Sequence, residues 1–203
     1  MMHENEGRRD FFSKRNRVYL YDGKVYKECM DEVAAREEYE ILSLLHEKGL
    51  QVPKPLERHD NLVTMEYISG EALPDLLCEE GVDLAALAHA LVEWMGAFYV
   101  AAEYAQSGWI RGDVNGRNFL MDSNGLVWGV DFETRVCGKM EQDGGRLVAF
   151  VESYDLPDPR RGELLAEKVA NELALRLGMD PELLRTEREK ELLAMKMRRG
   201  AKY

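Results

Sequence analysis

The sequence predicts an α+β protein, either one domain or two small lobes around one cleft, and three observations support this class. The first 68 residues hold β-rich runs and a single helical stretch, whereas most of the remaining chain has helical spacing. The length of 203 residues, with 45% hydrophobic composition, suits one domain or two small lobes. The sequence has no internal repeat and no linker long enough to separate independent domains. We therefore expect a single domain over residues 1–203.

The first lobe is expected to contain a hairpin, a helix and a further strand. The stretch RVYLYDGKVYKEC (17–29) holds two β-rich runs joined by Asp-Gly, a dipeptide that suits a type I′ turn. A helix is expected over 32–48, because apolar residues recur on one face: Val33, Ile41, Leu42, Leu44 and Leu45. The run LVTMEYI (62–68) predicts a buried strand, and an earlier strand is possible near 11–12.

The rest of the chain is mostly helical, apart from one hairpin. A short helix is expected over 74–77, and Asp83 can cap a long helix through Ala105. The core face of the long helix comprises Leu84, Leu87, Leu91, Met95, Phe98 and Ala102. NFLMDSNGLVWGV (118–130) predicts a hairpin turned at Asn-Gly, and GGRLVAFV is short and apolar. Two helices are expected to close the chain, Arg161 to Leu177 and Pro181 to about Met197.

Composition excludes several classes of function. The net charge of −11 argues against a general binder of nucleic acid or membrane surfaces. The three cysteines are scattered without a CxxC pair, which supports neither a zinc site nor a disulfide framework and fits a reducing cytoplasm. The first residues lack the apolar core of a signal peptide, and no apolar run approaches 18 residues. We therefore expect a cytoplasmic protein that does not span a membrane.

Positive charge gathers at both ends of this acidic chain. The clusters are Arg8, Arg9, Lys14, Arg15 and Arg17 at the start, and Lys196, Arg198, Arg199 and Lys202 at the end. Solvation explains both clusters at ordinary surface positions. The alternative for the C-terminal tail is docking on the chain's own acidic surface or on an acidic partner such as RNA.

One stretch carries most of the polar chemistry. WIRGDVNGRNFLMDSNGLVWGVDFET (109–134) holds Asp113, Asn118 and Asp131 in that order. Since Asn118 and Asp131 lie at the two ends of the predicted hairpin, they are expected to be close in space. An amide oxygen and a carboxylate there would suit Mg²⁺, which prefers oxygen ligands and shares them with nucleotide phosphates. Asp113 is then free to face a substrate hydroxyl, although each residue alone also suits an ordinary turn.

A lysine in the first lobe is a second candidate. Lys27 ends a β-rich run, where a lysine is usually solvated. The following helix carries Glu37 and Glu38, and either is able to meet Lys27 and fix its ammonium group against phosphate oxygens. Glu38 is preferred, because it lies one turn before Leu42 on a buried side. Glu37 instead aligns with the other apolar positions of that helix, and the alternative for at least one of the two is a solvated acidic face.

Together, these residues resemble the protein-kinase-like superfamily. That superfamily has a strand lysine, a helix glutamate, a hinge strand, a catalytic loop H-x-D-x-x-x-x-N and a metal-binding D-F-G. The corresponding features here are Lys27, Glu38, TMEYISG (64–70), RGDVNGRN (111–118) and DFE (131–133). The resemblance covers nearly all of the chain. It implies a bilobal fold, with a small antiparallel sheet and one helix in residues 1–68 and a reduced, mostly helical second lobe in 69–203.

The resemblance also implies a role for each residue in binding ATP. Met65 is the gatekeeper behind the adenine, and the backbones of Glu66 and Ile68 bond its polar edge. Lys27, paired with Glu38, holds the α- and β-phosphates. 

For the chemical step, the resemblance makes Asp113 the catalytic base. Asn118 and Asp131 become the ligands of Mg²⁺. Cofactors are therefore expected to be ATP and Mg²⁺.

Departures from the usual kinase motifs narrow the resemblance. Gly112, Asn115 and DFE are similar to aminoglycoside and sugar kinases, Rio kinases and the small kinase of the KEOPS tRNA-modification complex. Arg111 replaces the usual histidine, which packs the loop. Glu133 either adds a carboxylate near the metal or is a solvated acid.

Further departures concern the phosphate loop and the end of the chain. SKRNR (13–17) replaces a glycine-rich loop and offers charge in place of backbone N–H groups. No A-P-E motif appears, so an activation loop with its peptide-binding shelf is not expected. Asp143 is either the anchor of the catalytic loop from the following helix or a turn residue. The size and the basic tail are most similar to the KEOPS kinase.

Three functions are compatible with these residues. The first is an atypical serine/threonine protein kinase that transfers the γ-phosphate of ATP to a protein hydroxyl. The second is a kinase for a small-molecule alcohol, such as a sugar or an aminoglycoside-like compound. The third is a nucleotide-binding pseudokinase that acts through a partner. The third is disfavoured because Lys27, Asp113, Asn118 and Asp131 are all intact, and favoured by the missing glycines.

Overall fold

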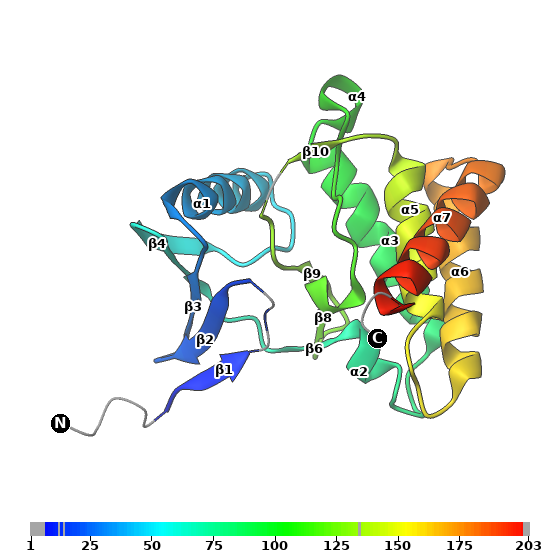
Figure 1. Cartoon of the computed structure of the whole chain (residues 1–203), viewed down its shortest axis with the longest axis horizontal. Coiled ribbons are helices and arrows are strands. Elements are labelled where there is room, and N and C mark those ends of the chain that lie inside the picture. The colour runs from blue at the N-terminus through cyan, green and yellow to red at the C-terminus, as the bar shows by residue number, and fades with distance from the viewer. Residues whose placement is uncertain (1–6, 12, 14, 134, 201–203) are drawn as a thin grey trace.

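The computed structural model describes residues 7–11, 13, 15–133 and 135–200. Figure 1 shows a β-rich lobe with one helix beside a larger, mostly helical lobe. The polypeptide crosses from the first lobe to the second after the last strand of the large sheet, near residue 67. This is the bilobal α+β architecture that the sequence predicts.

The first lobe is a five-stranded antiparallel sheet with a helix on one side. The strands lie in the order β1-β2-β3-β5-β4. They are β1 (Arg9–Phe11), β2 (Arg17–Tyr21), β3 (Lys24–Glu28), β4 (Pro55–His59) and β5 (Leu62–Glu66), and the helix is α1 (Glu32–Glu47). The β2–β3 turn has positive φ at Asp22 and Gly23, as a type I′ turn requires. Asp31 caps α1 by accepting a hydrogen bond from the Ala34 amide at 2.8 Å.

The register of the sheet places the key side chains on one face. Lys27 lies opposite Val63, and Val25 lies opposite Met65. Since side chains alternate along a strand, Lys27 and Met65 share the face that carries α1. The expected strand 62–68 ends earlier, at Glu66, where the Glu66 amide donates to the Lys54 carbonyl at 2.9 Å. The expected strand near 11–12 is β1, and Phe12 lies outside the described residues.

The second lobe begins with short elements around two small sheets. The sheets are β6 (Gly70–Ala72) with β8 (Phe119–Asp122) and β9 (Val127–Gly129), and β7 (Trp109–Ile110) with β10 (Val136–Cys137). The helices are α2 (Leu73–Leu76), α3 (Leu84–Ala101), α4 (Tyr104–Ser107) and the 3₁₀ turn η1 (Gly116–Asn118). The predicted hairpin is therefore formed by β8 and β9, and Gly125 in its turn has φ +78°.

The long central helix is shorter than the sequence suggested. We expected a helix from the Asp83 cap through Ala105, but α3 ends at Ala101. Glu103 adopts a left-handed backbone conformation with φ 51°, which breaks the helix before α4 begins. Its carboxylate also forms an ion pair with Lys48, at the end of α1.

Three further helices complete the lobe: α5 (Met140–Glu152), α6 (Pro159–Leu177) and α7 (Pro181–Gly200). α6 starts two residues earlier than expected, because Asp158 caps it and Pro159 takes its first position. The apolar run GGRLVAFV lies within α5. A Cβ atom on Gly145 would come within 2.8 Å of two backbone atoms of α7, so this glycine lets the two helices pack closely. α5 packs on α7 and α6, whereas α3 packs on α6.

The core of the second lobe is aromatic and centres on α3. Phe98 packs against Trp94, Tyr99, Trp109 and Phe132, with ring centroids 5.5–6.4 Å apart. α3 is by length and composition apolar enough to cross a membrane, which the sequence had not suggested. Half of that 18-residue window is buried within the protein, and α3 packs on α6. We therefore interpret α3 as a core helix.

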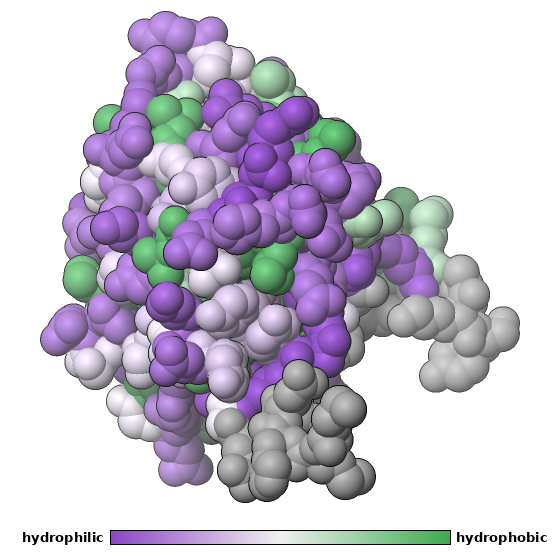
Figure 2. Space-filling model, turned by 90° about the vertical axis from the view of Figure 1, so that its left-hand side faces the viewer, coloured by the Kyte–Doolittle hydropathy of each residue, from purple (hydrophilic) through white to green (hydrophobic). Residues whose placement is uncertain are grey.

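The surface of the first lobe is mostly hydrophilic. Figure 2 views the molecule from that side and shows scattered green residues among predominantly purple ones. Such isolated apolar side chains are ordinary for a soluble surface. The face drawn there offers no broad apolar area among the residues that the structure describes.

Candidate active site

Lys27 is the charged centre of the cleft. Its Nζ lies 2.7 Å from Glu38 Oε2 and 3.8 Å from Glu133 Oε1, and it also contacts the Asp131 carboxylate. The alternative of a solvated strand lysine does not apply, since the Lys27 side chain is only 5% exposed. Glu38 is its partner on α1, whereas Glu37 is exposed. The preferred pairing is therefore the one that the structure contains.

The electrostatics of this pair depend on burial. Burial by itself lowers the pKa of Lys27, but Glu38 and Asp131 more than compensate, so that this pKa is raised. Burial raises the pKa of Glu38, and the attraction of Lys27 only partly opposes it. Among the described residues, Glu38 Oε1 is one of two buried side-chain atoms without a hydrogen-bond partner. The ammonium group thus stays charged and held in place.

Asp113 lies exposed at the start of the catalytic loop. Its Oδ1 accepts a hydrogen bond from the Asn115 amide at 3.1 Å, which orients the carboxylate within the loop. Asn118 is buried at the other end of the loop, and its Nδ2 lies 3.5 Å from the Asp113 carbonyl. Because the amide nitrogen of Asn118 points back into the loop, its Oδ1 is the atom left to meet a cation.

Asp143, on helix α5, anchors the start of the loop. Its carboxylate accepts hydrogen bonds from the amides of Arg111 at 2.6 Å and Gly112 at 2.8 Å. The Tyr99 hydroxyl donates to it at 3.1 Å. Asp143 is fully buried within α5, and of the two readings its geometry selects the anchor rather than the turn residue. Burial raises the pKa of Asp143, against the effect of the donated hydrogen bonds.

Arg111 links the loop to the segment that carries Asp131. Its Nη2 donates to the carbonyls of Val130 at 2.6 Å and Asp131 at 2.9 Å. Its guanidinium lies 4.0 Å from the centre of the Phe132 ring. Asp131 has φ 67°, a left-handed conformation that is uncommon for residues other than glycine. Arg111 is thus a packing residue, as the sequence suggested, and it holds an otherwise costly backbone shape.

Asn118 and Asp131 meet at the base of the hairpin, as predicted. Phe119 pairs with Gly129, and the Val130 amide donates to the Asn118 carbonyl at 2.9 Å. In the part of the chain that the structure describes, no cluster of three or more His, Cys, Asp or Glu side chains is arranged for a metal. An amide and a carboxylate still fit Mg²⁺, which commonly keeps several waters and takes further oxygens from substrate phosphates.

The three predicted hinge residues lie at the end of β5 and in the link between the lobes. Met65 is buried on β5, on the same face of the sheet as Lys27. Glu66 is exposed at the end of β5, and Ile68 is buried in the link that leads to β6. The Glu66 amide is occupied by the Lys54 carbonyl, so Glu66 has only its carbonyl to offer to a base edge.

Glu133 joins the two lobes. The Asn16 side chain donates to its Oε1 at 2.8 Å, and Arg15 Nη1 lies 3.9 Å from its Oε2. Glu133 is therefore neither simply solvated nor turned away from the cleft. Of the basic residues expected in the phosphate loop, Arg15 and Arg17 are largely exposed, and Lys14 lies outside the described residues.

Sequence reasoning missed three residues of this site: Asn16, Tyr99 and Tyr154. Tyr99 supports Asp143, and the Tyr154 hydroxyl accepts a hydrogen bond from the Gly116 amide at 2.8 Å. Their contacts join positions 38 or more residues apart, and no local sequence pattern predicts such contacts. Asn16 lies within SKRNR (13–17), where the basic residues drew attention to phosphate contacts and the asparagine did not.

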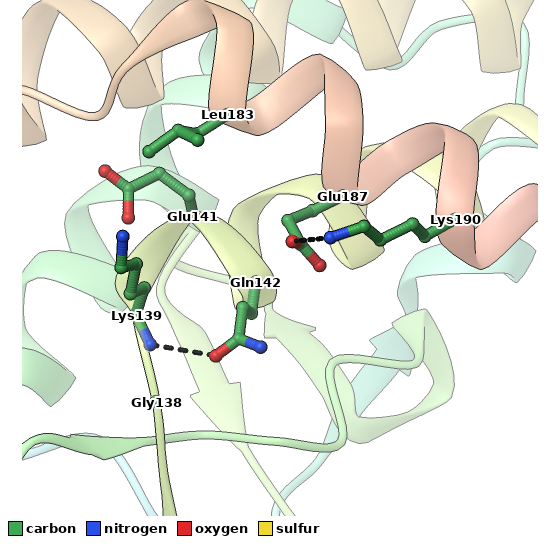
Figure 3. A pocket seen from close by; sticks show the side chains of 7 residues that line it. All are labelled: Gly138, Lys139, Glu141, Gln142, Leu183, Glu187 and Lys190. Atoms are coloured by element: carbon green, nitrogen blue, oxygen red, sulfur yellow. Dashed lines mark hydrogen bonds and ion pairs between the residues drawn. The ribbon is translucent and has the colours of Figure 1, made fainter.

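A surface hollow lies outside the cleft, between the start of α5 and α7. Figure 3 shows the lining of this hollow: Gln142 of α5 and Lys139, the residue before α5, on one side, and Leu183, Glu187 and Lys190 of α7 on the other. Within this hollow, Glu187 pairs with Lys190 at 2.7 Å, and the backbone amide of Lys139 donates to the Gln142 side chain. None of the predicted site residues lines this hollow. The candidate active site therefore rests on the geometry of the cleft.

Comparison with known proteins agrees with this geometry. The RIO domain model matches residues 6–143. The serine/threonine-protein kinase rio2 of Schizosaccharomyces pombe is 30% identical over 132 residues, which are 64% of this chain and 36% of that protein. The 3-deoxy-D-manno-octulosonic acid kinase of Stenotrophomonas maltophilia is 28% identical over 114 residues, 52% of this chain and 43% of that one.

The fold has a counterpart among solved structures. The structure of the gentamicin–APH(2″)-IIa complex matches with a TM-score of 0.56 and 14% identity, covering 92% of this chain and 90% of that one. This likeness concerns the fold alone. The chain spans about a third of the length of the fission-yeast relative. Since the family model covers more than half of the sequence and includes the cleft residues through Asp143, the chain belongs to the RIO domain family of atypical, protein-kinase-like proteins.

Proposed function

We propose that this chain is an ATP- and Mg²⁺-dependent phosphotransferase, and that it acts as an atypical serine/threonine protein kinase. One observation carries the proposal: Lys27 is buried and charged between Glu38 on α1 and Asp131 beside the catalytic loop. A purely structural ion pair would not require Asp113 and Asn118 at the same cleft. The relatives named serine/threonine-protein kinase in yeasts and a nematode support the same reading.

In this proposal, binding of the nucleotide rearranges the charges around Lys27. The ammonium group now contacts Asp131 and would turn to the α- and β-phosphates, still fixed by Glu38. Asp131, 39% exposed, and the Oδ1 of Asn118 would then hold Mg²⁺. The bound metal would neutralise part of the negative charge on the phosphates. Glu133 remains bound to Asn16 and keeps the phosphate-side loop over the cleft.

Asp113 would orient the acceptor. Its carboxylate is exposed to the cleft while its backbone is fixed through Asn115, so it is able to accept a hydrogen bond from a hydroxyl group. The proton of that hydroxyl would pass to an Asp113 carboxylate oxygen as the hydroxyl oxygen bonds to the γ-phosphorus and the bond from that phosphorus to the β,γ-bridging oxygen breaks, which releases ADP. Cys29, which lies 3.8 Å from Glu38, takes no part, because burial raises the pKa of this thiol to about 12.

A second candidate is a kinase for a small-molecule alcohol. It is favoured by the similarity to a protein named 3-deoxy-D-manno-octulosonic acid kinase. The cleft chemistry is common to both, so only the acceptor differs. A reducing, cytoplasmic setting suits either function, since all three cysteines are free.

The test is phosphate transfer by the purified protein. The chain is incubated with ATP and Mg²⁺, alone, with cell lysate and with a panel of sugars, and products are identified by mass spectrometry. We expect Mg²⁺-dependent phosphorylation of the chain itself or of a lysate protein, abolished by Asp113→Asn. Phosphorylated sugars without phosphoprotein would establish the second candidate. If nothing is phosphorylated, the transferase proposal fails.

A further inference from the structure

One tyrosine from outside the catalytic loop contacts the middle of that loop. Tyr154 lies in the turn between α5 and α6, partly buried against the core. It is 36 or more residues away in sequence from every loop position. Its hydroxyl nevertheless contacts the middle of the loop, between Asp113 and Asn118, whereas Asp143 holds only the start of the loop at Arg111 and Gly112.

The Tyr154 hydroxyl acts both as a hydrogen-bond acceptor and as a donor. It accepts a hydrogen bond from the Gly116 amide at 2.8 Å and donates to Asn115 Oδ1 at 3.4 Å. Asn115 Oδ1 also accepts from the Arg117 amide at 3.0 Å, which starts the turn η1. Burial raises the pKa of Tyr154 to about 12, so the hydroxyl keeps its proton at physiological pH.

The absence of a side chain at Gly116 makes this contact possible. A Cβ atom on Gly116 would lie 2.4 Å from the Tyr154 hydroxyl and 3.1 Å from Leu73 of α2. The backbone is thus pressed against the phenol so closely that only glycine fits without movement. Since Gly116 is buried, its amide would be left without a partner if the hydroxyl were removed, which is costly.

The same segment sets the distance between the two functional ends of the loop. The Asn118 amide donates to the Asn115 carbonyl at 2.8 Å, and the Asn115 amide donates to Asp113. Asn115 is therefore bonded on one side to the proposed base and on the other to the proposed metal ligand. We infer that Tyr154 is a positioning residue: it clamps the Asn115–Gly116 peptide and thereby fixes Asp113 relative to Asn118 during phosphate transfer. This inference rests on the proposed function.

The first experiment compares Tyr154→Phe with the wild-type protein. The variant keeps the ring and removes one oxygen. We expect kcat for phosphate transfer to fall about 10-fold or more, because small displacements of reacting groups are costly in rate. Nucleotide affinity measured without Mg²⁺ should stay within about twofold by the same reasoning, since Lys27 and Met65 lie on other elements. A kcat within twofold of wild type would overturn the inference.

Tyr104→Phe is the matched control. Tyr104 is a partly buried tyrosine at the start of α4, whose ring packs on Tyr99 at 5.6 Å. Its loss of a hydroxyl tests the general effect of Tyr→Phe in this lobe, and kcat should be unchanged. An equal loss of kcat in both variants would contradict a specific role for Tyr154.

Hydrogen exchange tests the clamp without relying on activity. The Gly116 amide should exchange at least 10-fold faster in Tyr154→Phe than in wild type or in Tyr104→Phe, because its acceptor has been removed. Unchanged exchange at Gly116 would overturn the inference. A wild-type chain that transfers no phosphate would instead refute the proposed function, and the exchange measurement would still decide whether Tyr154 holds the loop.

A second variant covers the case in which Tyr154→Phe does not fold. Gly116→Ala forces the loop away from the same hydroxyl, and kcat should fall to a similar extent. Where both fold, the double variant should be little worse than either single variant, because both changes break one contact. Fully additive losses would show that the two residues act independently, against the inference.

Discussion

Replacing Lys27 by Met should destabilise the protein, because Lys27 neutralises a buried carboxylate. Lys27 and Glu38 have side chains only 5% and 2% exposed, so solvent screens their attraction little. Breaking a buried ion pair by removing one partner costs about 3–5 kcal/mol. With an m-value of about 2–3 kcal/mol/M, the midpoint of urea unfolding should fall by roughly 1–2 M. Lys24→Met, at an exposed position on the same strand, should move it by less than about 0.3 M.

The loss of stability in Lys27→Met should also depend on pH. Burial raises the pKa of Glu38 in the folded state, and loss of Lys27 would raise it further. A raised folded pKa means that stability is full below the unfolded value, about 4.3, and is lost as pH rises through the folded value. The deficit of Lys27→Met should therefore shrink as pH is lowered from 8 to 5.

A second substitution, at Glu38, tests whether the unpaired buried carboxylate causes the loss of stability. Glu38→Gln in the Lys27→Met background removes the orphaned charge, and it should recover a good part of the lost stability. If Lys27→Met unfolds at the wild-type urea concentration, or if Glu38→Gln lowers its stability further at pH 8, the reasoning about this pair is wrong.

Three further predictions concern contacts within the second lobe. Asp143→Asn turns an acceptor of two backbone amides partly into a donor, so urea unfolding should show a loss of about 2–3 kcal/mol and kcat should fall with it; wild-type kcat would contradict the anchoring role. Gly129→Ala places a methyl group 2.1 Å from the Trp94 ring and should cost about 1–3 kcal/mol, visible as a lower Tm. Arg188→Ala breaks a partly exposed bidentate pair with Glu152 between α7 and α5, and double-mutant analysis should give at most about 1 kcal/mol.

The ordered motif residues were predictable because spacing along the chain fixes their geometry. A hairpin brings its ends together whatever surrounds it, so Asn118 and Asp131 could be placed from the turn at Gly125 alone. Glu38 was favoured over Glu37 from the apolar periodicity of one helix. In each of these cases, a local rule was sufficient.

Other features depend on contacts that no local rule contains. The pairing of Lys27 with Glu38 was predicted, against the usual solvation of a strand lysine, but its contacts with Asp131 and Glu133 were not, because these carboxylates arrive from a distant segment. The break of α3 at Glu103 depends on a left-handed residue that is not glycine, and glycine is the usual signal for it. Tyr154 lay in a loop without pattern, and its function as a clamp requires the tertiary fold.

The central claim is that Asp113 and Asp131 have different tasks in phosphate transfer. The most direct measurement compares nucleotide affinity, with and without Mg²⁺, and the transfer rate for Asp113→Asn, Asp131→Asn and Asn118→Ala. Asp113→Asn should bind Mg·ATP normally but lose about 10²–10⁴-fold in rate. Asp131→Asn should lose Mg²⁺-dependent binding as well as rate, and Asn118→Ala should do so more mildly. If Asp113→Asn loses nucleotide while Asp131→Asn keeps both nucleotide and rate, the account is contradicted.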